Sequence, residues 1–286
     1  MTKRVISVFL CALCVISSFS FTVSAKENKE YTSDNFLSVA DGIIAWKKAD
    51  NGSEPDGYLI NDKYLENAGT TPGDWYPIAL GRLGIQDNNE GYLAVIKDRV
   101  EERYRESGRL SAAKATEWHR IALAVLAMGG DPTNFGTDEN GAPINLISDG
   151  TYDRGKTTPL GRQGINGWIW GLITLDSMRY AVPDGAYNTR DDIIVEIISK
   201  QLSDGGFALS SDDADPDITA MAITALAPYY NSEKIYSYHR KALSADESKT
   251  VHEVVDEAVL CLSRLQLDTG DYKSWGTQNV ESTDWV

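Results

Sequence analysis

The chain has 286 residues, and its 27 Lys and Arg against 42 Asp and Glu give a formal net charge of −15. Hydrophobic residues make up 42% and charged residues 24%, a globular composition that excludes wholesale disorder, a collagen-like repeat and a disulfide scaffold. A chain this acidic has no broad electrostatic attraction to nucleic acid or to anionic lipid, so we expect neither as a partner.

The first 25 residues have the features of a secretory signal peptide. Lys3 and Arg4 give a positive start, residues 5–21 are mostly apolar or small, and the leader ends in Val-Ser-Ala, which fits the cleavage pattern. The apolar run is short for a membrane-spanning helix, and no second span follows it. We therefore expect cleavage of residues 1–25, a linker over 26–33, and a protein that is secreted or held at the cell surface.

Apolar residues three and four positions apart predict helices along the rest of the chain. No alternation longer than four residues, of the kind that predicts a strand, is present, so we expect an all-α fold. In chain order, the expected helices span residues 36–48, 74–83, 89–106, 117–126, a short stretch near 145–147, 166–175, 191–201, 217–226 and 250–266.

An internal repeat relates four of these helices. The segments that begin at Asp74, Glu117, Asn166 and Asp217 align without gaps, with steps of 43, 49 and 51 residues, and a fifth copy begins at Glu281. Each segment is apolar on nearly all sides and has a small residue at its sixth position, which predicts inner helices that approach one another closely. The helices between them are amphipathic and are expected to lie outside. Such pairs close into a ring or form a solenoid.

The first position of the repeat is acidic or amide-bearing in every copy. Acidic groups in the first helical turn interact favourably with the helix dipole, and Thr71-Pro72 and Asp215-Pro216 are typical of an N-cap followed by proline. This structural interpretation competes with a functional one, because every copy would point this end the same way. Two loops are also alike: residues 201–207 and 266–272 each combine a glycine turn with an aromatic residue that can plug the space beneath.

Together these motifs resemble the squalene cyclase and prenyltransferase superfamily, whose fold is an α/α toroid. The likeness covers residue 34 to the end and is greatest to secreted bacterial proteins related to the cobalamin carriers transcobalamin and intrinsic factor. It implies a toroid over 34–286 and, by fold-level analogy, a corrinoid as a candidate ligand. The carriers add a small β-domain, for which we expect no counterpart within these residues. The segments that carry the resemblance are residues 118–124, 129–136, 161–167, 201–207 and 215–222.

Two other functions remain open. The superfamily includes terpene cyclases that protonate an alkene with an aspartic acid, and Asp217 occupies the matching position; however, Ile218 replaces the second acid that would tune it. The other is an adhesion or scaffold module without a small ligand.

We expect no metal or cofactor, because Cys261 is predicted to be a buried apolar side chain and no two of His119, His239 and His252 have the short spacing of zinc ligands.

Non-catalytic binding is the function that we favour. Inner-helix starts converge at one mouth of a toroid, and aromatic side chains with a few polar groups in a concavity are typical of a ligand site. The tryptophans could equally be plain core residues. The predicted ligand-binding residues are Asp74, Trp75, Tyr76, Glu117, Trp118, His119, Gln163, Asn166, Trp168, Trp170, Asp217 and Thr219.

The repeat also bears on length. Helix pairs can be counted at 36–83, 89–126, about 141–175 and 191–226, and a fifth begins at 250 and ends with the chain. Related toroids close with about six pairs, so we expect an open ring, a truncated C-terminus, and an exposed apolar edge beside residues 221–226.

Overall fold

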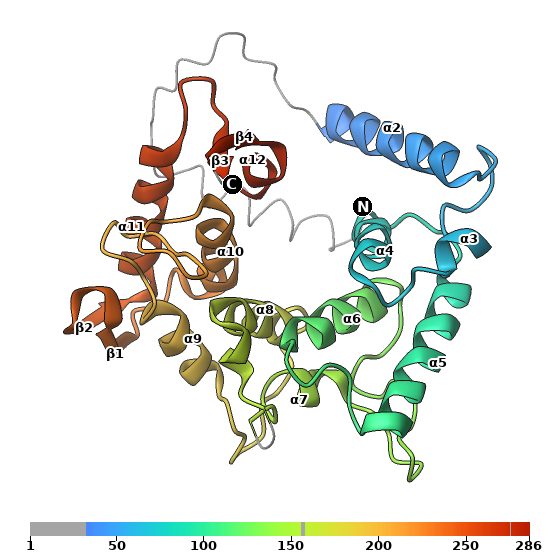
Figure 1. Cartoon of the computed structure of the whole chain (residues 1–286), viewed down its shortest axis with the longest axis horizontal. Helices are drawn as coiled ribbons and strands as arrows, with labels where there is room; N and C mark the ends of the chain where they lie inside the picture. The colour runs from blue at the N-terminus through green and yellow to red at the C-terminus, as the bar shows by residue number, and fades with distance from the viewer. Residues whose placement is uncertain (1–32, 156–157, 275) are drawn as a thin grey trace. The chain divides into compact units, whose positions relative to one another are not determined.

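The computed structural model describes residues 33–155, 158–274 and 276–286 (Figure 1). The chain divides into two units, residues 1–40 and 41–286, and the boundary falls within helix α2 (Ser33–Asn51). The predicted signal peptide and most of the predicted linker lie outside the described residues. Every element after α2 belongs to the second unit.

The second unit is mainly helical, as we predicted. Short 3-10 turns, η1 (Leu160–Gln163), η2 (Ala227–Tyr229) and η3 (Lys241–Leu243), connect some of its elements. Its α-helices are α3 (Asp62–Leu65), α4 (Thr71–Leu83), α5 (Asn89–Ser107), α6 (Ala115–Ala127), α7 (Leu146–Gly150), α8 (Ile165–Asp176), α9 (Arg190–Ile198), α10 (Pro216–Leu226), α11 (Val251–Leu265) and α12 (Val280–Trp285).

The copies of the repeat form a row of packed helices. Helix α4 packs against α6, α6 against α8, α8 against α10, and α10 against α12; Figure 1 shows α6 between α4 and α8. Glycine allows close approach, because a Cβ on Gly81 of α4 would lie only 2.1 Å from the Ala127 carbonyl oxygen at the end of α6. Leucine side chains fill the interior of the row, including Leu80, Leu172 and Leu226.

The amphipathic helices flank this row. Helix α9 packs against α8 and α11 packs against α10, while α5 joins α4 and α6 through hydrogen bonds of Tyr92 and Tyr104. Each flanking helix buries one face, as a 3.6-residue apolar period requires. On α9 that face consists of Ile193, Ile194, Ile197 and Ile198, all without solvent exposure.

The two similar loops have the same conformation, which confirms that prediction. Residues 201–207 and 266–272 turn at Gly205 and Gly270, whose φ angles are +91° and +90°, in the region that favours glycine. Aromatic side chains are buried beneath both turns, namely Phe207 and Tyr272.

The expectation of a chain without strands was wrong. Strands β1 (Ile235–Arg240) and β2 (Ala245–Thr250) form an antiparallel hairpin, and β3 (Tyr272–Ser274) pairs with β4 (Thr277–Asn279). Side chains of β1 alternate between exposed and buried. The buried face of β1 consists of Tyr236, Tyr238 and Arg240. Because none of these is aliphatic, a search for alternating aliphatic residues missed this strand.

One helix start also differs from our prediction. Thr70, rather than Thr71, is the N-cap of helix α4, and the Thr70 side chain makes no capping hydrogen bond. Helix α10 begins as predicted, because the Asp215 carboxylate accepts a hydrogen bond of 3.0 Å from the Ile218 amide.

The predicted apolar edge along residues 221–226 is covered. Helix α12 packs against α10 at this end of the row, and Thr224 is the one member of that segment in the exposed class. Elsewhere in the second unit, large apolar side chains are exposed at Ile43 and Trp46 of α2 and at Leu260 of α11.

Candidate ligand site

Asp74 lies at the centre of a buried polar network. Its carboxylate has no solvent exposure and accepts hydrogen bonds of 2.7 Å from the Tyr92 hydroxyl, the Arg120 Nε and the Gly69 amide. Burial raises the pKa of Asp74, and these donors oppose the rise. These partners lie on α5, on α6 and in the turn before α4, so Asp74 ties these elements together.

Glu117 and Trp118 also make internal contacts. Glu117 accepts a hydrogen bond from the Ser111 amide and pairs with Arg103 at 3.3 Å, which holds the loop before α6. The indole Nε1 of Trp118 donates to the Tyr104 hydroxyl at 3.0 Å, and the Arg154 guanidinium lies 4.3 Å from the centre of its ring. Trp118 is 2% exposed and is therefore a core residue.

His119 is fully buried beside Trp118. Its Nε2 lies 2.7 Å from the Gly150 carbonyl oxygen, an acceptor, so Nε2 carries the proton. Burial lowers the pKa of His119 to about 3, which keeps the ring neutral. Among the described residues, Nδ1 has no hydrogen-bond partner.

Two further predicted residues, Gln163 and Thr219, make contacts within the fold. The Gln163 side chain accepts a hydrogen bond of 3.0 Å from the Thr116 hydroxyl. The Thr219 hydroxyl accepts from the Phe207 amide at 2.9 Å, which anchors the loop 201–207 to α10. In the next copy of the repeat, the Thr283 hydroxyl accepts from the Tyr272 amide at 3.1 Å. Thr219 thus has the same anchoring contact as its counterpart.

Trp168 and Tyr76 are half-buried near lysines. The Lys200 Nζ lies 5.8 Å from the centre of the Trp168 ring, and the Lys47 Nζ lies 5.6 Å from the centre of the Tyr76 ring. Both rings also pack against the core cluster. They are separate from the aromatic cluster described next.

A cluster of three tryptophans joins helices α4, α8 and α12. The ring centres of Trp75 and Trp170 are 5.6 Å apart, and those of Trp170 and Trp285 are 5.9 Å apart and nearly perpendicular. Trp75 is 40% exposed, and the other two are partly exposed. Aromatic pairs at these distances stabilise each other, and the incomplete burial leaves ring surface available to a ligand. We call these residues the tryptophan cluster.

In two copies of the repeat, a polar side chain lies one helical turn before the position that Trp170 occupies. Asn166 precedes Trp170 by four residues on α8, and Asp217 precedes Met221 by four on α10, so each pair shares a helix face. Trp170 and Met221 occupy the same position in successive copies. Asn166 and Asp217 therefore share helix faces with Trp170 and Met221.

Asn166 and Asp217 differ from Asp74 in their bonding. In the part of the chain that the structure describes, one buried side-chain oxygen of each lacks a hydrogen-bond partner. Burial, together with the nearby Asp215 and Glu281 carboxylates, raises the pKa of Asp217, and the neighbouring Ser282 hydroxyl opposes the rise. Buried acceptors without partners are uncommon in proteins, so these oxygens are candidates to receive hydrogen bonds from a ligand. The Asn166 oxygen is the better of the two, because the Asp217 carboxylate has the buried Ser282 hydroxyl beside it.

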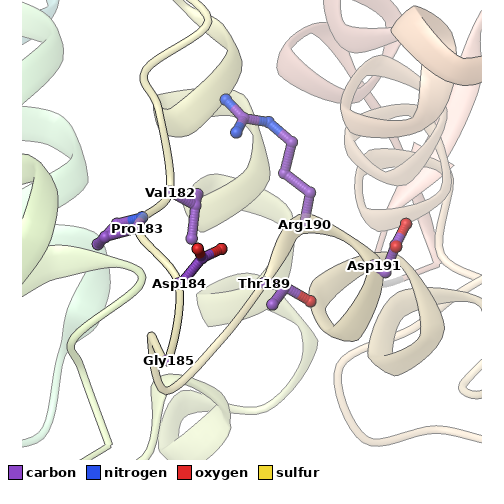
Figure 2. Close-up of a pocket in the computed structure, with 7 residues that line it drawn as sticks. All are labelled: Val182, Pro183, Asp184, Gly185, Thr189, Arg190 and Asp191. Carbon is purple, nitrogen blue, oxygen red and sulfur yellow. The ribbon is translucent and has the colours of Figure 1, made fainter.

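A hollow of about 320 Å³ lies elsewhere, at the start of α9 (Figure 2). The Arg190 guanidinium extends away from the Gly185 turn in Figure 2 and binds Asp176 at 2.8 Å. The hollow includes none of the residues that we predicted. Its lining consists of Val182, Pro183, Asp184, Gly185, Thr189, Arg190 and Asp191.

The structure therefore divides the predicted set. It brings Trp75 and Trp170 together and leaves acceptors on Asn166 and Asp217, but it places Asp74, Trp118 and His119 in internal contacts. Sequence reasoning missed Trp285, although the repeat contained the signal: Trp285 has the same position after Glu281 as Trp170 has after Asn166.

Comparison of the chain with protein-family models, with curated proteins and with solved structures gives no match. Within the described ranges, no helix is long and apolar enough to cross a membrane.

Proposed function

We propose that the chain is a non-catalytic ligand-binding domain and that its ligand contacts the tryptophan cluster. The observation that carries this proposal is the meeting of partly exposed rings from three helices, Trp75, Trp170 and Trp285. Exposed indole faces in contact are costly to leave in water and are common anchors in binding sites. The signal peptide expected at residues 1–25 supports a secreted or cell-surface location.

The toroid is part of the same proposal. The row of helices α4, α6, α8, α10 and α12, flanked by α9 and α11, has the order of inner and outer helices that an α/α toroid requires. In that fold the inner helices surround the ligand, and the tryptophan cluster belongs to inner helices only.

A corrinoid is the ligand class that we propose. The resemblance to cobalamin carriers suggests it, and the chemistry of the cluster is compatible with it. A corrinoid offers a broad apolar face to indole rings, and its peripheral amide groups can donate hydrogen bonds to the acceptors of Asn166 and Asp217.

A titration with cobalamin and cobinamide tests this proposal. We expect a saturable change in the visible absorbance of the corrin, and at least a roughly tenfold weaker affinity in Trp170→Ala, which removes the central ring. Trp46→Ala is the matched control, because Trp46 is 61% exposed on α2 and lies outside the cluster. No saturable change with either compound would refute the corrinoid, and equal losses in the two variants would refute the site.

A screen for co-purifying small molecules tests whether the tryptophan cluster binds a ligand even if that ligand is not a corrinoid. A bound compound of another class, released by Trp170→Ala and retained by Trp46→Ala, would keep the site and replace the corrinoid. Absence of any cluster-dependent ligand in both experiments would favour an adhesion or scaffold module.

One observation favours a second candidate function, protonation of an alkene by Asp217. Burial and the neighbouring Asp215 and Glu281 carboxylates raise the pKa of Asp217, which is the direction that an acid catalyst requires. Ile218, where related cyclases have a second acid, argues against it. Incubation with polyprenyl substrates tests it by product analysis: a cyclised product that Asp217→Asn abolishes would support the enzyme, and equal product from both proteins would reject it.

A further inference from the structure

Three polar side chains converge where η2 meets α11, outside the tryptophan cluster. The Tyr230 hydroxyl donates to Asp256 Oδ1 at 2.9 Å, His252 Nε2 lies 3.2 Å from Asp256 Oδ2, and the Tyr230 oxygen lies 3.4 Å from His252 Nε2. The proposed ligand site does not include these groups, and the Tyr230 ring also packs against the core cluster. We call them the Tyr-His-Asp cluster.

The backbone and the rings hold the cluster in place. His252 and Asp256 are four residues apart on α11, so they lie on one helix face. The Tyr230 ring stacks on the imidazole, with ring centres 4.3 Å apart and an interplanar angle of 19°. Stacking brings the hydroxyl and Nε2 to the same edge of the pair, where both point toward the carboxylate.

The distances match those between ligands of a small metal ion. First-row divalent cations bind imidazole nitrogen and carboxylate oxygen at about 2.0–2.2 Å, so neighbouring ligands are separated by roughly 3 Å in octahedral and 3.4 Å in tetrahedral geometry. The separations in the structure, 2.9–3.4 Å, fall in this range. We propose that Tyr230, His252 and Asp256 bind a divalent transition-metal ion of the Zn²⁺ or Cu²⁺ type.

Charge and access fit this role. The side chains of His252 and Asp256 are 50% and 37% exposed, so a hydrated ion can reach them and keep water in its remaining positions. When the metal binds, Nε2 loses its proton to solvent or to the other ring nitrogen, and the Tyr230 hydroxyl turns its proton from Asp256 to solvent and binds as a neutral oxygen. The nearby Glu253 is occupied otherwise, because its carboxylate accepts from the Thr250 amide and hydroxyl in a helix cap.

Sequence spacing alone did not reveal this site. The described residues contain no metal-binding group of three His, Cys, Asp or Glu side chains, and we expected no metal because the histidines are widely separated. The fold supplies the third ligand as a tyrosine, 22 residues from the histidine. Tyrosine oxygen is a weaker ligand than carboxylate, so we place the affinity in the micromolar range rather than that of a structural zinc site.

Calorimetric titration of the untagged chain with Zn²⁺ near neutral pH tests the proposal, with Co²⁺ as a spectroscopic probe of imidazole ligation. We expect one site per chain. His252→Ala and Asp256→Asn each weaken Zn²⁺ binding by at least about tenfold, and Tyr230→Phe, which keeps the stacked ring, weakens it several-fold.

His239→Ala is the matched control. His239 pairs with Asp246 through Nδ1 at 2.9 Å and is 58% exposed, so it offers a comparable histidine–carboxylate pair on the hairpin. We expect this variant to bind Zn²⁺ as the unmodified chain does. Absence of saturable binding, an equal loss in His239→Ala, or unchanged affinity in Tyr230→Phe would each overturn the three-ligand site. Circular dichroism of every variant confirms that folding is retained.

Discussion

Replacement of Arg120 by methionine probes the buried network around Asp74. Methionine keeps most of the aliphatic volume of arginine but removes the guanidinium, which binds Asp74 at 2.7 Å and also donates to the Gly69 carbonyl at 2.9 Å. The Asp74 side chain is fully buried and that of Arg120 is 14% exposed. The substitution therefore leaves a carboxylate in the core without its counter-charge.

The size of the effect follows from this burial. Removal of one partner from a buried ion pair costs about 3–5 kcal/mol, and the small residual exposure of Arg120 places the expected loss of unfolding free energy near 3 kcal/mol. Arg103→Met is the control, because Arg103 makes the same kind of pair with Glu117 at 3.3 Å but is 43% exposed. Pairs that exposed contribute about 0–1 kcal/mol.

Urea denaturation followed by circular dichroism measures both variants at neutral pH. A third protein, Asp74→Asn with Arg120→Met, should recover part of the loss, because the neutral amide no longer requires a cation; we expect a coupling of about 2 kcal/mol. A cost of Arg120→Met below about 1 kcal/mol, or no larger than that of Arg103→Met, would refute the view that Asp74 is a structural charge.

Three further predictions concern stability. The buried His119 has a pKa of about 3 in the folded chain against about 6.5 when unfolded, so its contribution to stability is complete above pH 6.5 and is lost as the pH falls toward 3. The melting temperature should therefore fall less steeply across this range in His119→Gln, and parallel curves for the two proteins would contradict this prediction. Gly205→Ala should destabilise more than Gly270→Ala in urea, because both have positive φ but only at Gly205 would the new Cβ meet a backbone oxygen, at 2.7 Å; equal costs would show that strain alone matters. Thr219→Val removes the hydroxyl that binds the Phe207 amide and should cost about 2 kcal/mol in chemical denaturation, whereas a neutral substitution would refute the anchoring role.

The helices were predictable from the chain because each carries its own apolar period and several share the repeat. The expected helix over 89–106 is observed as Asn89–Ser107, and the one over 250–266 as Val251–Leu265. The hairpin was missed because its buried face is built from Tyr236, Tyr238 and Arg240, which do not form an aliphatic alternation.

The roles of the site residues depended on contacts distant in sequence. Asp74 and Asn166 hold the same position in the repeat, yet Asp74 meets an arginine 46 residues away whereas the Asn166 oxygen has no partner among the described residues. A local pattern cannot distinguish the two. The tryptophan cluster was half predictable: the convergence of inner-helix starts predicted Trp75 and Trp170 at one site, whereas Trp285 was missed although the repeat marks its position.

The tryptophan cluster also bears on folding cooperativity. In a row where each helix packs only on its neighbours, stability is a sum of local terms, and one end can unfold while the other persists. Trp170 contacts Trp75 of α4 and Trp285 of α12, two helices that are each separated from α8 by another member of the row. Unfolding of α4 or α12 therefore removes a ring contact of Trp170. The cluster thus couples the two ends of the row and favours a single unfolding transition.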